Sequence, residues 1–227
     1  MNFEIICSNC GAPSSPSVGV CPFCKAVLTV KGSKDAPTIT KIRALFNDGK
    51  LDQALSLAQA LEKEKPSVLK NPNFVILYVQ ILLEADGPSS KMKSLLSLAL
   101  LKNPDNSLLS EYLEIVEAKS HLSHEKNDLG EVMLTNIIRR SPQNVYALFL
   151  LGSHLFWVEK DTQRSLKYLE ECVRIRPNFL RASACLAALY KTLDFDAPAA
   201  RLFKRCAALT TSQNMKKYFK SLASTSV

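Results

Sequence analysis

Four prolines recur at nearly equal intervals along the chain, and this spacing constrains the fold more than any other feature. They stand at Pro66, Pro104, Pro142 and Pro177, which gives gaps of 38, 38 and 35 residues. Periods near this length are typical of solenoids in which each repeat is one helical hairpin. Such a hairpin has one apolar face that it cannot bury alone, so neighbouring hairpins must stack. The proline spacing therefore predicts an all-α helical-repeat solenoid.

Small residues occupy a fixed position in most of these units. Twelve positions before the four prolines the chain carries, in order, Ala54, Met92, Gly130 and Ser165. A fifth unit, which lacks the proline, has Ala199 at the same place. The residues four positions further on are, from the first unit to the fifth, Ala58, Leu96, Leu134, Leu169 and Phe203. A small residue followed by a large one is expected where two helices cross closely, and Met92 departs from this pattern.

The first helices of the last two units complete the pattern. The positions of the motif W-x2-L-G-x2-Y are filled in the fourth unit by Leu148, Leu151, Gly152 and Leu155, and in the fifth by Ser183, Leu186, Ala187 and Tyr190. Residues 37–211 thus resemble the tetratricopeptide-repeat family, and the resemblance implies about five stacked hairpins. Units two and three each carry about four extra residues, so the pattern does not fix their helix boundaries.

Residues 212–227 are predicted to form a capping helix and a tail. Apolar side chains recur there at helical spacing, at Met215, Tyr218, Phe219 and Leu222. Lysines occupy the other side of the same helix, at Lys216, Lys217 and Lys220. A terminal helix of a solenoid needs one face for the last repeat and one face for water.

The first thirty residues contain two closely spaced cysteine pairs. Cys7 and Cys10 are separated by two residues, as are Cys21 and Cys24, with ten residues between the pairs. This spacing resembles the zinc-ribbon family, in which four thiolates hold one structural Zn²⁺ ion. We expect a small β domain over residues 1–30, with short strands around Ile5 and Val27 and a loop over residues 12–20. Residues 31–36 form a polar linker. The alternatives are a redox dithiol or a coincidental spacing.

The remaining cysteines and the overall composition indicate a cytoplasmic protein. Cys172, Cys185 and Cys206 fall on apolar stripes of predicted helices and are expected to be buried. An odd total of seven cysteines with CxxC pairs favours metal binding over disulfides. No positively charged leader precedes an apolar segment, and the longest apolar run, residues 74–83, is too short for a membrane span.

The resemblance to the tetratricopeptide-repeat family also implies where a partner would bind. In that family the first helix of each repeat lines a concave groove. The corresponding residues here are Tyr146, Phe149, Ser153, Phe156 and Trp157 in the fourth unit, Arg181 and Lys191 in the fifth, and Tyr112 in the third. Aromatic and arginine side chains dominate binding hot spots, so this surface is a candidate for a peptide or helix of a partner protein. The alternative is that the aromatic residues pack between repeats.

These features predict a non-catalytic adaptor. The sequence has no glycine-rich phosphate loop and no nucleophile elbow. Its net charge of +8 is concentrated in residues 139–227, which carry 15 basic and six acidic side chains and favour an acidic partner. An alternative function is nucleic-acid binding through the ribbon and this basic part. A third is a zinc-responsive switch, in which loss of the metal frees the array.

Overall fold

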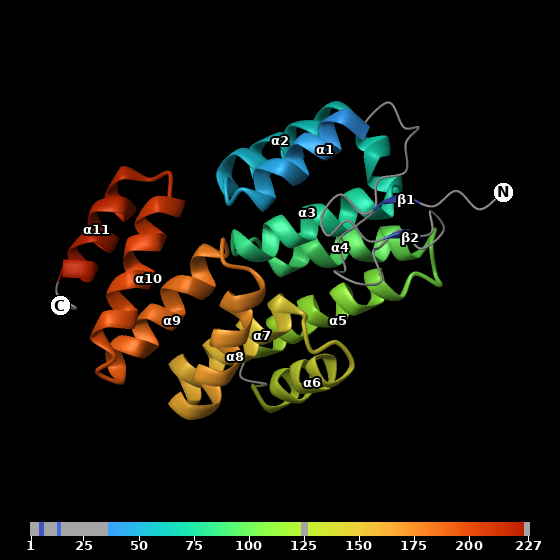
Figure 1. The fold of residues 1–227 in the computed structure, drawn as a ribbon. Coiled ribbons are helices and arrows are strands. Elements are labelled where there is room, and N and C mark those ends of the chain that lie inside the picture. Colours follow the sequence, from blue (N-terminus) through green and yellow to red (C-terminus); the bar gives the residue numbers. More distant parts are fainter. Residues whose placement is uncertain (1–4, 7–12, 15–35, 124–126, 225–227) are drawn as a thin grey trace.

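The structure is a computed structural model that describes residues 5–6, 13–14, 36–123 and 127–224. Within these residues five antiparallel helical hairpins follow one another (Figure 1). They are α1 (Ala36–Asn47) with α2 (Leu51–Glu64), α3 (Pro72–Glu84) with α4 (Ser89–Leu100), α5 (Ser107–Leu122) with α6 (Asn127–Arg140), α7 (Val145–His154) with α8 (Thr162–Ile175), and α9 (Leu180–Thr192) with α10 (Asp196–Leu209). A last helix, α11 (Gln213–Ser224), packs on α10. The predicted helical array and its capping helix are confirmed.

The described part of the N-terminal region consists of two very short strands. β1 (Ile5–Ile6) pairs antiparallel with β2 (Pro13–Ser14), so that Ile5 lies opposite Ser14 and Ile6 opposite Pro13. The strand predicted at Ile5 is confirmed, whereas the prediction of a loop over residues 12–20 is wrong at Pro13–Ser14. The four predicted zinc ligands, Cys7, Cys10, Cys21 and Cys24, lie outside the described residues.

The small residues recognised in the sequence lie in the second helix of each hairpin, and all are buried. Gly130 of α6 lies so close to α5 that an added Cβ would stand 2.7 Å from a methyl carbon of Leu122. In the fourth hairpin the Ser165 hydroxyl donates a hydrogen bond of 2.7 Å to the Gly152 carbonyl. Met92 is fully buried as well, since a long unbranched side chain can adapt to an irregular gap. These positions therefore mark the helix crossings, as the spacing predicted.

The extra residues of the second and third units extend the helical structure. A 3-10 turn, η2 (Pro66–Lys70), joins α2 to α3 and buries Val68. In the third unit α5 is 16 residues long, against 13 residues for α3. The insertions thus change the lengths of the hairpins and leave their order unchanged. In the fourth unit, which has no such insertion, a π-helical turn, η3 (Leu155–Glu159), ends the first helix before α8 begins.

Side-chain caps start the first helices of the second, third and fourth units. Asn71, Asn106 and Asn144 each accept hydrogen bonds from backbone N–H groups in the first turn of their helix. These caps satisfy donors that have no partner within the helix. The corresponding position before α9 is Phe179, which makes no side-chain cap and is almost completely buried. Tertiary packing has therefore replaced local capping at the start of the fifth unit.

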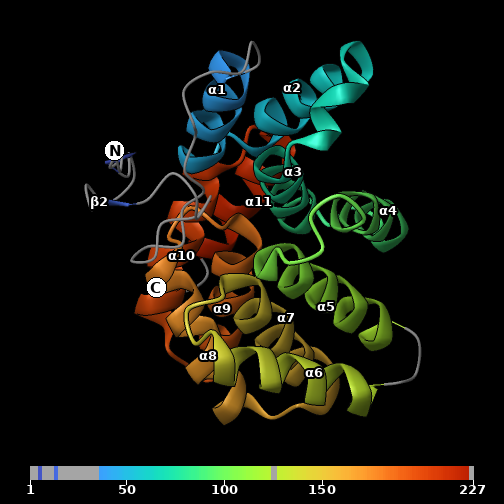
Figure 2. The same cartoon turned by 90° about the vertical axis from the view of Figure 1, so that its right-hand side faces the viewer.

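The hairpins wind so tightly that the first one contacts the last ones (Figures 1 and 2). The Asn178 side chain, before α9, donates a hydrogen bond of 2.9 Å to the backbone carbonyl of Asn47 at the end of α1. The Thr211 hydroxyl, after α10, hydrogen-bonds to the Asp52 carboxylate of α2. Gly49, with φ of +76°, brings the α1–α2 turn so close that an added Cβ would stand 3.0 Å from a methyl carbon of Leu209. The array is thus closed on itself.

Candidate partner-binding surface

The residues predicted to bind a partner divide into a buried group and an accessible group. Tyr112, Tyr146, Phe149 and Phe156 expose only 4–6% of their surface. Trp157 exposes 55%, Lys191 is exposed, and Ser153 and Arg181 are half-buried. A partner can therefore reach the second group directly, whereas contact with the first group would require the surrounding helices to separate.

The buried aromatic residues form a continuous cluster across three first helices. The Tyr112 and Tyr146 ring centroids lie 5.8 Å apart, and the Phe149 ring lies 4.7 Å from the ring of Phe179. Tyr146 also contacts Phe179, at 6.1 Å. Tilted pairs at such distances are favourable beyond the area that they bury. This inner aromatic cluster (Tyr112, Tyr146, Phe149 and Phe179) fills the face of the helices on which the groove was predicted.

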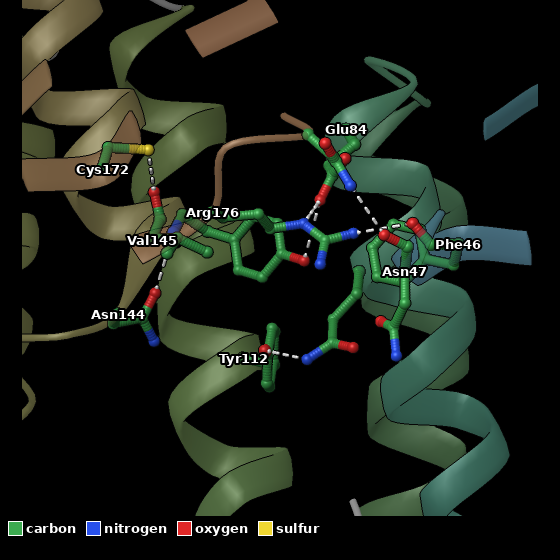
Figure 3. A network of polar contacts seen from close by, with 11 residues as sticks. Phe46, Asn47, Glu84, Tyr112, Asn144, Val145, Cys172 and Arg176 are labelled. Atoms are coloured by element: carbon green, nitrogen blue, oxygen red, sulfur yellow. Dashed lines mark hydrogen bonds and ion pairs between the residues drawn. The ribbon is translucent and has the colours of Figure 1, made fainter. Parts of the chain in front are cut away.

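Arg176 lies at the edge of this cluster and joins three hairpins (Figure 3). Its guanidinium forms an ion pair with Glu84 at the end of α3 and donates a hydrogen bond of 3.2 Å to the Phe46 carbonyl of α1. The same group lies 4.0 Å from the centroid of the Phe46 ring, in cation–π geometry. One side chain after α8 thus holds the ends of α1 and α3 together.

Glu84 is the most deeply buried acid among the described residues, with 4% of its surface exposed. Burial raises the pKa of the Glu84 carboxyl to about 7, although the Arg176 charge beside it acts in the opposite direction. The Tyr146 hydroxyl donates a further hydrogen bond of 3.5 Å to this carboxylate. Burial also raises the pKa of the Tyr146 hydroxyl, which therefore remains a donor. One Glu84 oxygen, Oε1, thus accepts hydrogen bonds from both Arg176 and Tyr146.

The π-helical turn η3 determines how Trp157 is presented. Within it Phe156 turns inward and Trp157 outward, with their ring centroids 4.3 Å apart. The turn ends at Lys160 in the left-handed conformation, and the Lys160 ammonium donates to the Trp157 carbonyl at 2.7 Å. The Trp157 side chain lies near Cys185 and acts to lower the pKa of its thiol, so the indole faces α9. Such π-helical turns are frequent at functional sites.

Arg181 continues this surface along α9, one helical turn before Cys185. Its guanidinium lies 5.1 Å from the centroid of the Phe149 ring and forms an ion pair of 3.2 Å with Asp86 after α3. Asp86 forms a second ion pair, also of 3.2 Å, with Lys119 of α5. Both partners of Asp86 are cations, so the rim between α5 and α9 stays positively charged. We call Ser153, Trp157, Arg181 and Lys191 the α7–α9 surface.

Sequence reasoning did not identify Phe46, Glu84, Arg176 or Phe179. Glu84 carried the clearest signal, because it is an acid that directly follows the longest apolar run of the chain. Phe179 stands where the equivalent residues of the preceding units are asparagines, which indicates a special packing role. Periodicity could not pair these residues, since Glu84 and Arg176 are 92 positions apart.

The predicted burial of the three remaining cysteines is confirmed. Cys172, Cys185 and Cys206 are buried free thiols. Burial raises the pKa of Cys172, and raises that of Cys185 and of Cys206 to about 12, so the thiolate form is suppressed. Over residues 36–123 and 127–224 no group of three or more His, Cys, Asp or Glu side chains is arranged to hold a metal ion. None of the helices in these segments combines the length and apolarity of a membrane span.

Comparison with known proteins identifies the fold. No family model matches the chain, and no curated protein matches it. The solved structure of TTC0263, a thermophilic TPR protein of Thermus thermophilus, is similar over 83% of this chain and 98% of that chain, with 13% identity and a TM-score of 0.51. The helical array has the tetratricopeptide-repeat fold.

Two further structures match with lower scores. A form of MamA from Desulfovibrio magneticus RS-1 is 17% identical and has a TM-score of 0.39, with 82% of this chain and 99% of that chain covered. YrrB, described as a TPR protein with an unusual peptide-binding site, is 15% identical and has a TM-score of 0.41, with 82% of this chain and 91% of that chain covered.

Removal of the Arg176 side chain tests whether the ion pair joins the array. Arg176→Ala leaves the Glu84 charge buried without its partner, so we expect the free energy of unfolding to fall by about 3–5 kcal/mol at mildly alkaline pH. Urea unfolding followed by circular dichroism measures the change. The control is Arg174→Ala, which removes an exposed pair with Glu171 and should have little effect. Equal losses in the two variants would contradict a joining role for Arg176.

The raised pKa of Glu84 predicts a specific pH dependence. Between its ordinary pKa of 4.5 and about 7, the unfolded chain has released the Glu84 proton while the folded chain retains it. The contribution of Glu84 to the free energy of unfolding is therefore present at low pH and is lost as the pH rises through this window, by at most about 1.4 kcal/mol per pH unit. Glu84→Gln cannot ionise and should lack this slope. Parallel stability curves for the two proteins would show that the carboxyl titrates normally.

Proposed function

We propose that this protein is a non-catalytic adaptor that binds a partner protein on the α7–α9 surface. The observation that carries the proposal is Trp157, a large aromatic side chain that is 55% exposed although the turn around it is well ordered by hydrogen bonds. Val158 beside it is exposed to a similar extent. Tryptophan in a rigid setting is a frequent anchor of protein interfaces, because it buries much area at little conformational cost.

The charges around Trp157 indicate the chemistry of this partner. Arg181 is half-buried and Lys191 is exposed, although each also pairs with an acid of the chain, Asp86 and Asp196 respectively. A partner segment with an apolar residue over Trp157 and acidic residues toward α9 would complement the surface. In this proposal Tyr112, Tyr146, Phe149 and Phe156 support the surface from the interior.

We also propose that residues 1–30 form a zinc ribbon that holds one structural Zn²⁺ ion. The donor set of Cys7, Cys10, Cys21 and Cys24 suits tetrahedral Zn²⁺, and four thiolates leave no open position for catalysis. The pairing of Ile6 with Pro13 is consistent with the proposal, because it brings together the chain on both sides of the first cysteine pair. The ion would supply folding energy that so short a segment cannot obtain from a core.

Substitution of Trp157 tests the binding surface. Because the side chain is mostly exposed, Trp157→Ala should leave the helical content unchanged while it weakens partner capture by more than about tenfold. The measurement is a quantitative pull-down from lysate of the source cells, with the captured proteins identified by mass spectrometry.

The matched control for this experiment is Leu101→Ala, which removes an apolar side chain that is 80% exposed beyond the end of α4. This variant should capture the same partner as the wild type. If Trp157→Ala captures it equally well, the α7–α9 surface is not the binding site.

Metal analysis tests the ribbon. The purified protein should contain about one zinc ion per chain, because four thiolates make one tetrahedral site. Cys21→Ser should lose the metal and retain the helical content, since the described helices form their own core. Protein purified without zinc, or a Cys21→Ser variant that keeps it, would contradict the site.

A further inference from the structure

From Arg201 onward, helix α10 and the capping helix α11 carry positive charge that no acidic residue of the same segment balances. After Asp196 the chain has no acidic residue. It has six basic ones, namely Arg201, Lys204, Arg205, Lys216, Lys217 and Lys220. Arg205 donates a hydrogen bond of 3.1 Å to Ser183 and is half-buried. The other five, of which only Lys216 is half-buried, we call the α10–α11 basic surface.

No side chain of the α10–α11 basic surface has an ion pair or hydrogen bond with the described residues. The earlier hairpins differ in their balance of charge, since residues 37–196 carry 20 basic and 19 acidic side chains, and some of the cations pair between helices. Lys91 of α4 pairs with Glu62 of α2 at 2.8 Å, and Arg164 of α8 pairs with Glu131 of α6 at 2.5 Å. Like charges that lack partners repel one another and favour the approach of an anion. The net charge thus changes from nearly balanced before α10 to strongly positive after Asp196.

Helix geometry places the charges of the two helices on the same side. The rings of Phe203 and Phe219 stack, with centroids 6.4 Å apart, and so fix which faces of α10 and α11 meet. Lys204 and Lys220 each follow one of these rings by one residue, which is a rotation of about 100°. Because the helices are antiparallel, the two rotations turn toward the same side of the hairpin. Arg201 and Lys216 lie one turn from these lysines and extend the row on each helix.

The composition of the surface favours an acidic protein segment. A second copy of the chain would bring the same sign of charge and be repelled. Four of the five cations are lysines, whereas phosphate recognition favours the planar fork of arginine. Nucleic-acid grooves also interleave cations with several aromatic residues for base stacking, and α11 exposes only Tyr218. Met215, exposed on the same helix, suits an apolar side chain of a polypeptide.

We propose that the α10–α11 basic surface docks an acidic, partly apolar segment of a partner protein. The surface shares no residue with the α7–α9 surface, so it is a second interaction site and does not depend on the function proposed above. A partner that reaches both surfaces would gain affinity from the linkage, because the second contact becomes intramolecular.

A labelled peptide tests this proposal on the full-length protein. The probe is a helical peptide of about twenty residues with glutamates and leucines spaced as on an amphipathic helix, and its binding is followed by fluorescence anisotropy. We expect Lys216→Gln/Lys217→Gln/Lys220→Gln to weaken binding about tenfold, which is about 1.4 kcal/mol. The control Lys41→Gln/Lys63→Gln/Lys102→Gln removes the same charge from exposed lysines elsewhere and should bind like the wild type.

Three results would overturn the proposal. Equal weakening in both triple variants would show that only net charge matters. Tighter binding of a single-stranded oligonucleotide of the same charge would assign the surface to nucleic acid, and tighter binding of vesicles rich in anionic lipid would assign it to a membrane. Because the probe also has the chemistry proposed for the α7–α9 surface, both triple variants are compared again in the Trp157→Ala background. The loss caused by the α11 lysine substitutions should persist there, so a failure of this proposal is distinguishable from a failure of the α7–α9 surface.

Discussion

The ion pair of Arg176 with Glu84 is the interaction on which the arrangement of this array depends. A half-buried cation is stabilised where its donors find acceptors, and here two acceptors come from two other hairpins. The pair therefore specifies one position of α1 and α3 relative to α9. Hydrophobic packing alone is less directional and would allow neighbouring repeats to slide. The aromatic rings around the pair are then held at fixed distances.

Closure of the array redistributes the roles of its residues. In an open solenoid the first helices offer their inner face to a ligand, and aromatic residues there would be contact residues. In this chain Tyr146 and Phe149 are part of the interior, because both rings pack on Phe179 and Tyr146 also hydrogen-bonds to Glu84 at the end of α3. The side chains that a partner can reach lie at the edges of the array, at Trp157 on the π-helical turn and along α10 and α11.

The periodicity of the sequence predicted most of the helices, but it did not predict contacts between residues that are far apart in the chain. Gly130 and Ser165 stand twelve positions before Pro142 and Pro177, and the structure places both at helix crossings, as this spacing predicts. The π-helical turn could not be foreseen, because the pattern through Leu155 reads as an ordinary helix. Whether the residues predicted to line the groove are buried depends on whether the two ends of the array meet. Periodicity describes neighbours in the chain and contains no information about partners such as Asn47 and Asn178.

The contact between the α1–α2 turn and the segment after α10 changes how the molecule should fold. In a linear solenoid each repeat senses only its neighbours, so terminal repeats fray and folding can begin anywhere. Here Asp52 and Thr211 are 159 residues apart and still touch. The chain must close a very long loop before this contact can form, which slows folding, but its ends are then protected from fraying. Closure thus turns an array with nearest-neighbour cooperativity into one cooperative unit.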